Sequence, residues 1–299
     1  VDGTFVAATN LGVNYIDPLK HTKEKITYAE LGIEAQIFSP NAHLEENNPY
    51  GLIYGNGAIC LLDIVERKPV TSLTTDLSIQ YAAVSRDGSH IYCTDDNGEI
   101  KAFKTSDLSG EALPAGLSAK KTVVQSSTIT VSRDGSYWAV LCSDNMVRIL
   151  RTANNPVIAE LPVYSDTTLF MAFAEDNKTF LLQGDDKRVF FYDLTENKYV
   201  NTLPTDIAIS SCIFDGEDSL SALTDGNDLY LLSSEDYGLL AYVPHAFTFI
   251  KGEKLFILKE RTSVSKLHYK NYTELIAEAK EQFDDLTLSE EKKMQYNIN

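Results

Sequence analysis

Short apolar runs alternate with tight polar turns along most of the chain, and the pattern repeats. Residues 81–104 read YAAVSRDGSHIYCTDDNGEIKAFK, and residues 129–151 read ITVSRDGSYWAVLCSDNMVRILR. Each stretch has an apolar run ending in V-S-R-D-G, a second apolar run, a turn rich in Asp and Asn, and an alternating third run. Short runs bounded by Asp, Asn and Gly are typical of antiparallel β-hairpins. We therefore expect three consecutive strands in each stretch.

The V-S-R-D-G phrase is expected to form the turn between the first and second strands. Gly88 and Gly135 stand at positions suited to a positive φ angle, which glycine adopts without steric cost. The aspartates before them, Asp87 and Asp134, can accept a hydrogen bond from their own local backbone. The sequence thus predicts the same turn chemistry in two adjacent units.

The same pattern recurs in five further segments, which are residues 2–18, 33–64, 168–194, 209–234 and 246–269. In all seven units the penultimate residue of the third run is apolar: Ile16, Leu62, Phe103, Leu150, Tyr192, Leu232 and Leu267. These positions are 35 to 47 residues apart, and four short strands in such a period are typical of a β-propeller blade. We predict an all-β, seven-bladed β-propeller of four-stranded antiparallel blades over residues 1–270, whose first blade lacks its innermost strand.

The wording of the repeats resembles that of WD-repeat propellers of bacterial type. The V-S-R-D-G turns are similar to the F-S-x-D-G phrase of such repeats, and F-S-P at 38–40 and F-A-E-D-N at 173–177 look like further copies. Leu62-Asp63 and Tyr192-Asp193 stand where the family has Trp-Asp. The chain departs from the family in having a single tryptophan, no Trp-Asp pair and no Gly-His pair. The resemblance implies a WD-like propeller.

From residue 271 the apolar spacing becomes helical, and residues 271–299 are predicted to form a two-helix tail. Leu275, Ile276, Ala279 and Phe283 lie on one stripe, and capping boxes begin at Asn271 and Thr287. The stripe has two interpretations. It packs on the rim of the propeller, or it offers a docking surface to another domain.

The tail wording, ELIAEAKEQF followed by LTLSEEKKMQY, resembles the segment after propellers in bacterial multidomain signalling proteins. Such proteins carry an N-terminal effector, such as an oligomerising ATPase, a kinase, a caspase-like protease or a Toll-receptor-like domain. The resemblance implies that this chain is the C-terminal recognition part of a larger signalling or defence protein. Residues before Val1 would then supply the innermost strand of the first blade and the fourth strand of the last.

The net charge of the chain indicates which classes of partner it binds. It has 26 Lys and Arg against 43 Asp and Glu, a formal net charge of −17, which argues against nucleic acid and anionic lipid. A basic protein, or other domains of the same chain, suits it better. No apolar run approaches the roughly 20 residues of a membrane-spanning helix, so no membrane insertion is expected. Buried free thiols are expected at Cys60, Cys93, Cys142 and Cys212, which favours a reducing, cytoplasmic location.

The sequence offers little catalytic chemistry. It has no Gly-rich phosphate loop and no G-x-S-x-G elbow, and we expect no cofactor. The histidines show no metal-ligand spacing; they are His21, His43, His90, His245 and His268. Among the expected innermost strands, Glu34 is the main ionisable residue. A non-catalytic interaction or sensor module is therefore favoured, the alternative being a propeller enzyme of lactonase or quinone-dependent type.

The turns between second and third strands should all emerge on one face of a propeller. In four consecutive units they carry acidic residues, which are Asp95, Asp96, Asp144, Asp185, Asp186, Asp225 and Asp228. One interpretation is that Asp is simply a good turn former in an acidic protein. The other is an acidic sector that binds a basic partner and makes the association fast and salt-dependent. These residues are the candidate partner-binding site.

Overall fold

The computed structural model describes residues 5–9, 11–17, 20–31, 41–43, 49–121, 128–163, 170–174, 176–184, 187–205, 208–209, 211–215, 220–224, 228–250, 255–259, 264–268, 270 and 274–278. Within these residues the strands form six sheets, and every strand pair is antiparallel. The only helix in these described ranges is one short turn at 274–278. The prediction of an all-β, antiparallel architecture is confirmed.

The six sheets follow one another along the sequence. The first has three strands: β1 (Phe5–Thr9), β2 (Gly12–Asp17) and β3 (Thr22–Ile26). The second has five: β4 (Asn41–His43), β5 (Tyr50–Asp63), β6 (Lys68–Val84), β7 (His90–Asp95) and β8 (Ile100–Lys104). The third has four: β9 (Ile129–Val131), β10 (Tyr137–Leu141), β11 (Met146–Arg151) and β12 (Val157–Pro162).

The remaining three sheets continue the same order. The fourth contains β13 (Phe170–Phe173), β14 (Thr179–Gln183), β15 (Arg188–Asp193) and β16 (Lys198–Pro204). The fifth contains β17 (Ser211–Asp215), β18 (Leu220–Thr224), β19 (Leu229–Ser233) and β20 (Leu239–Val243). The sixth contains β21 (Ala246–Ile250), β22 (Leu255–Lys259) and β23 (Val264–His268).

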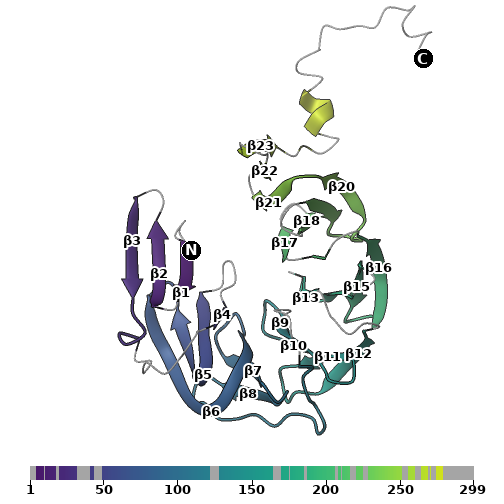
Figure 1. Ribbon diagram of the computed structural model, residues 1–299. Helices are drawn as coiled ribbons and strands as arrows, with labels where there is room; N and C mark the ends of the chain where they lie inside the picture. Colours follow the sequence, from purple (N-terminus) through teal and green to yellow (C-terminus); the bar gives the residue numbers. More distant parts are fainter. Residues whose placement is uncertain are drawn as a thin grey trace, which may run out of the picture.

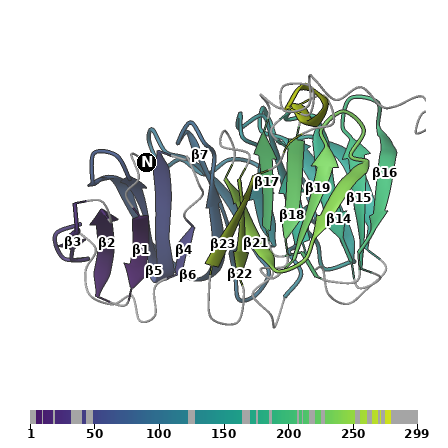
Figure 2. The ribbon, with the colours of Figure 1, turned by 90° about the horizontal axis from the view of Figure 1, so that it is seen from above.

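The sheets are arranged radially around an arc (Figure 1). Strands β9, β13 and β17 lie towards the centre, whereas β12, β16 and β20 lie on the outside. The arc is open between the sheet of β1 and the sheet of β23. Seen from above, the strands of neighbouring sheets stand side by side, so their turns gather at two opposite ends (Figure 2).

In the five-stranded sheet the chain crosses the sheet more than five times, because one of the five strands folds back on itself. The backbone N–H of Ile64 donates to the carbonyl of Pro49 at 2.8 Å, so the end of β5 lies beside its beginning and β5 folds back on itself. The equivalent bond in the third sheet joins Thr152 to Ser136 at 2.9 Å, across the separate strands β10 and β11. Strand β6 pairs with β5 through its first half and with β7 through its second half. The first half of β6 is therefore the outer strand of one set of hairpins, and its second half is the inner strand of the next set.

The doubled V-S-R-D-G phrase forms two matching turns. Gly88 has a φ angle of 69° and Gly135 one of 71°. The carboxylate of Asp87 accepts the backbone N–H of Ser89 at 3.0 Å, and the carboxylate of Asp134 accepts the backbone N–H of Ser136 at 2.9 Å. Both the positive φ angles and the Asp-to-backbone bonds agree with the sequence prediction.

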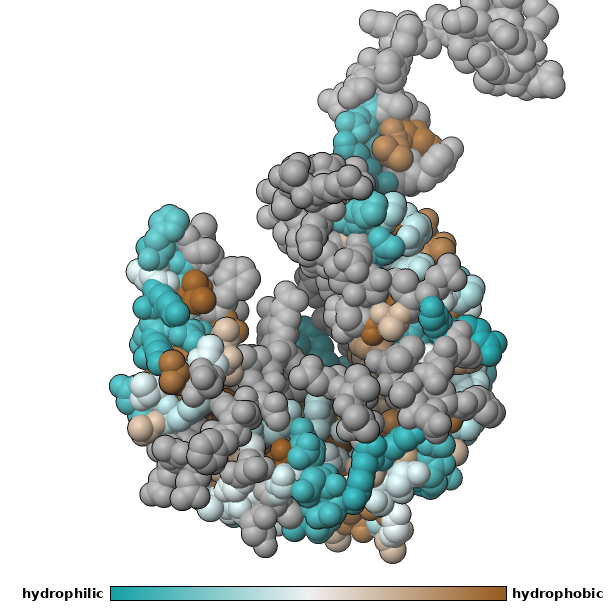
Figure 3. Space-filling view, viewed as in Figure 1, coloured by the Kyte–Doolittle hydropathy of each residue, from teal (hydrophilic) through white to brown (hydrophobic). Residues whose placement is uncertain are grey.

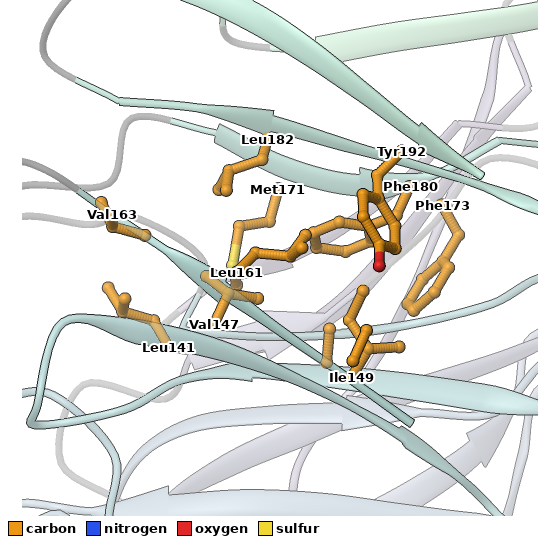
Figure 4. Packing of buried hydrophobic residues seen from close by; sticks show 12 residues of the cluster. Leu141, Val147, Ile149, Leu161, Val163, Met171, Phe173, Phe180, Leu182 and Tyr192 are labelled. Carbon is orange, nitrogen blue, oxygen red and sulfur yellow. The ribbon is translucent and has the colours of Figure 1, made fainter. Parts of the chain in front are cut away.

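Apolar clusters fill the space between neighbouring sheets. In Figure 4, Val147 and Ile149 of β11 point towards Met171 of β13 and Phe180 of β14. Phe180 is 0% exposed, and burying such a side chain stabilises the fold by about 1.5–3 kcal/mol. Because similar clusters lie between other neighbouring sheets, each sheet is held in place by the next.

Four outer strands share one irregularity. The register shifts where β5 meets β6, β11 meets β12, β15 meets β16, and β19 meets β20. One outer-strand residue is left without a register partner in each case: Val70, Ile158, Val200 and Leu240. A β-bulge of this kind twists the edge of a sheet and interrupts its ladder. All four bulge residues are apolar.

The described part of the tail is the helical turn at 274–278. Leu275 and Ile276 are 50% and 37% exposed, so these two stripe residues are not buried against the sheets. The helical turn shows apolar, brown surface near the top of Figure 3. Ala279, Phe283 and the second predicted helix lie outside the described residues. Among the described residues, no helix is both long and apolar enough to cross a membrane.

Candidate interaction surface

The turns that follow β7 and β10 lie together at one end of the sheets, and we call this end the acidic-turn face. The carbonyl of Gly98 accepts the N–H of Ala119 at 2.8 Å, and the carbonyl of Ser118 accepts the N–H of Ser143 at 2.9 Å. Residues 118–119 therefore connect the two turns directly. Neighbouring sheets present these turns on one continuous surface.

Asp95 and Asp96 have different surroundings within the first of these turns. Asp95 is buried, and one of its carboxylate oxygens accepts the N–H of Asn97 at 2.9 Å and of Glu99 at 2.7 Å. Asp96 is exposed, and its N–H donates to the carbonyl of Ser78 on β6 at 3.1 Å. Asp95 thus holds the shape of the turn, while Asp96 presents its carboxylate to solvent.

Asp144 occupies the equivalent turn of the next sheet and is also exposed. Arg148 donates to both of its carboxylate oxygens, at 3.0 and 2.6 Å, and to Glu160 at 2.8 Å. The hydrogen bonds from Arg148 lower the pKa of the Asp144 carboxyl. Lys120 adds a second cation, donating to Asn145 at 2.6 Å. Asp144 is therefore ionised at neutral pH but partly neutralised.

Asp228 is half-buried, and its hydrogen bonds stabilise the local structure. Its carboxylate accepts the N–H of His245 at 2.8 Å and the hydroxyl of Tyr242 at 2.7 Å. These bonds, that of His245 first, lower the pKa of the Asp228 carboxyl. The other three predicted site residues, Asp185, Asp186 and Asp225, lie outside the described residues. Of the predicted site residues, the described turns thus bring together Asp96 and Asp144 as exposed acids.

The opposite end of the sheets carries the V-S-R-D-G turns, which also meet. A Cβ placed on Gly135 would lie 3.4 Å from the Cβ of Ser85, and the N–H of Asp134 donates to Asn177 Oδ1 at 3.0 Å. Arg86 and Arg133 stand at equivalent, half-buried positions in these turns. Burial, and then the nearby charge of Arg86, lowers the pKa of Arg133. The doubled phrase is the sequence signal for this basic pair, although from the phrase alone only turn chemistry was predicted.

One group near this end resembles part of a Ser–His–acid arrangement. Ser89 Oγ lies 2.7 Å from His90 Nδ1, and His90 Nε2 lies 3.7 Å from Glu111 Oε1. The second distance is too long for a hydrogen bond. Ser89 Oγ also lies 2.7 and 2.8 Å from the two carboxylate oxygens of Asp87, which attract its single proton. These contacts fix the turn and do not activate a nucleophile.

The cysteines have no feature of a reactive site. Cys60, Cys93 and Cys142 are buried and Cys212 is partly buried, and no disulfide joins these four described residues. Burial raises the pKa of Cys60 and of Cys93 to about 12, so both thiols stay protonated and unreactive at neutral pH. Within the described ranges, no group of three or more His, Cys, Asp or Glu side chains is placed to hold a metal ion. Glu34 lies outside them.

Comparison with known proteins identifies the fold. No protein-family model matches the chain, and no curated protein matches its sequence. The β-propeller domain of Cps50 (Swd1) from Myceliophteria thermophila superposes with a TM-score of 0.60 at 10% identity, covering 90% of this chain and 93% of that one. A chain of the mitotic checkpoint complex superposes with a TM-score of 0.56 at 12% identity, covering 75% and 74%. The chain therefore has a β-propeller fold.

Proposed function

We propose that residues 1–270 form a seven-bladed, WD-like propeller that serves as a non-catalytic protein-interaction module. The seven-blade count is supported by the five-stranded sheet, in which β5 folds back and β6 is shared between two hairpin systems. Counted as two blades, that sheet and the other five give seven. The three-stranded sheet of β1–β3 supports a first blade without its innermost strand. Residues 271–299 form the helical tail.

The observation that carries the proposed function is the continuity of the acidic-turn face. Asp96 and Asp144 are exposed in equivalent turns, and residues 118–119 bridge those turns by backbone hydrogen bonds. A rigid scaffold that gathers loops on one face is suited to recognition. With a net charge of −17, the partner we propose is a basic protein or a basic domain of the same polypeptide. We propose that Asp185, Asp186 and Asp225 belong to the same acidic sector.

We further propose that the module belongs to a larger bacterial signalling or defence protein that works in the cytoplasm. The support is the likeness of the tail wording to that of bacterial multidomain signalling proteins. In such an assembly the propeller recognises a signal and an effector domain responds to it.

The test is a pull-down from lysate of the source cells at low and moderate salt. The variant Asp96→Asn with Asp144→Asn removes two exposed charges of the acidic-turn face. A matched control, Glu66→Gln with Glu196→Gln, removes two exposed charges that lie in turns at the opposite end. We expect a partner that salt weakens, that the first variant loses and that the control retains. A partner bound equally by both variants contradicts the proposed face, and no protein partner at either salt contradicts the function.

A further inference from the structure

A second surface lies on the outer strands of two neighbouring sheets. Val200 on β16, and Leu239, Leu240 and Tyr242 on β20, are each between 43% and 50% exposed. We call these four residues the rim patch. Brown surface reaches the outer edge of the arc in Figure 3, where β20 lies in Figure 1. Isolated exposed apolar side chains are ordinary, but adjacent ones on neighbouring elements indicate an interaction site.

The bulges explain why these side chains are exposed. Val200 and Leu240 are the bulge residues of their strands, and each follows an apolar residue, Tyr199 and Leu239 respectively. In a regular strand successive side chains point to opposite faces, so one of each pair would be covered by a neighbouring sheet. The bulge breaks that alternation and leaves Leu239 and Leu240 both about half-exposed. The Tyr199 ring instead packs against Tyr192, on the side of the third sheet, and lies outside the patch.

The two strands are held rigidly relative to each other. Asn201 Nδ2 of β16 donates to the carbonyl of Asp236, just before β20, at 3.0 Å. The rings of Phe191 and Tyr237 stack between the same two sheets with centroids 4.5 Å apart. Because these contacts fix the spacing of β16 and β20, the rim patch is formed before any partner binds. Such preorganisation lowers the entropic cost of binding.

The edge chemistry indicates which kind of partner fits. The outer strand β3 carries Lys23, Glu24 and Lys25, charges of the kind that protect an edge, whereas β20 has no charged residue. The bulge at Leu240 interrupts the row of backbone groups that an added strand would need. A partner would therefore contact the patch through side chains, as an amphipathic helix does.

Charges around the patch indicate whether the bound helix is positively or negatively charged. Glu235 and Asp236 are exposed at one end of β20, and Asp228 lies at the other end, where it accepts the Tyr242 hydroxyl. The cation on β16, Lys198, forms an ion pair with Glu196. The apolar surface is thus bordered by an excess of carboxylates, which favour a positively charged partner.

We propose that the rim patch binds a basic amphipathic helix of a partner protein. The inference rests on the proposed role in protein recognition and adds a second contact surface, on the outer strands of two sheets. The helix would place apolar residues at i, i+3, i+4 and i+7 against the patch and lysines or arginines towards the bordering carboxylates.

The test uses a defined probe, a synthetic amphipathic helix of Leu and Lys, with a second peptide in which Glu replaces Lys. Binding to the whole chain is measured by fluorescence anisotropy. The variant Val200→Ser with Leu240→Ser removes the centre of the patch. The matched control Val65→Ser with Val70→Ser removes two equally exposed apolar side chains elsewhere, at 50% and 49%. Circular dichroism verifies that each variant is folded.

We expect the Leu–Lys peptide to bind, the patch variant to weaken it about tenfold, and the control to change affinity less than about twofold. The Glu peptide should bind at least about tenfold more weakly. The inference is overturned if the Leu–Lys peptide does not bind, if the Glu peptide binds equally, or if the patch variant has no effect. Loss of binding only in the Asp96→Asn, Asp144→Asn variant also overturns it, by placing the peptide on the acidic-turn face and leaving the proposed function intact.

Discussion

At the scale of single residues, the doubled V-S-R-D-G phrase shows that identical residues in equivalent turns can have different packing surroundings. Gly88 and Gly135 have nearly the same φ angle. The space around them differs, because a Cβ on Gly88 would lie 2.8 Å from the ring of Tyr50. On Gly135 the nearest atom would be the Cβ of Ser85 at 3.4 Å, a tight but ordinary contact. The local sequence cannot distinguish these positions, since the difference comes from residues that are distant in the sequence.

This comparison gives a stability prediction. Both Gly88→Ala and Gly135→Ala force alanine into a left-handed conformation, which costs about 1–2 kcal/mol. Gly88→Ala adds a collision with the Tyr50 ring, so it should lower the free energy of unfolding by more than Gly135→Ala does. Urea denaturation followed by circular dichroism measures both. Equal losses, or a larger loss for Gly135→Ala, would contradict the packing described for Tyr50.

At the scale of elements, the hairpin turn after β7 separates structural from exposed acids. Asp95 is 7% exposed and satisfies two backbone N–H groups, whereas the neighbouring Asp96 carboxylate faces solvent. Sequence reasoning placed both residues in one acidic sector. The sequence assigns both residues to the same turn, but it does not show that Asp95 is buried and Asp96 is exposed. That distinction depends on which carboxylate reaches the N–H groups of Asn97 and Glu99.

The turn therefore yields a matched pair of substitutions. Asp95→Ala leaves the N–H groups of Asn97 and Glu99 without their acceptor, and we expect a loss of about 1–3 kcal/mol in the free energy of unfolding. Asp96→Ala should change stability by less than about 0.5 kcal/mol, as surface substitutions commonly do. Thermal unfolding of the two variants beside the parent measures the difference. If Asp96→Ala proved the more destabilising, the assignment of roles in this turn would be wrong.

Hairpins were the most predictable elements, because their signals are local. The alternation of apolar residues and the turns at Gly88 and Gly135 identified strands β7, β10 and β11 and their antiparallel pairing. The bulges at Val200 and Leu240 were not predicted, although two adjacent apolar residues in a strand are their sequence signal. Adjacent apolar residues also occur in strands buried on both faces, so the pattern alone does not identify an exposed pair.

At the scale of the whole molecule, the repeat organises sheets into an arc with two distinct ends. Backbone bonds through residues 118–119 connect the turns at one end, and the V-S-R-D-G turns contact each other at the opposite end. The radial arrangement followed from the period of the sequence, which predicted a propeller. The composition of each face did not follow, because it depends on side chains brought together from different sheets. Function in such a fold belongs to these surfaces rather than to the fold itself.

The most direct test of the account is a map of where a protein partner binds. We would compare amide hydrogen exchange of the chain alone with that of the chain bound to the partner captured by pull-down. The account predicts slower exchange in the turns at residues 95–99 and 142–146 of the bound chain, and unchanged exchange at residues 86–89 and 133–136. Protection confined to the latter turns would contradict the acidic-turn face as the recognition surface.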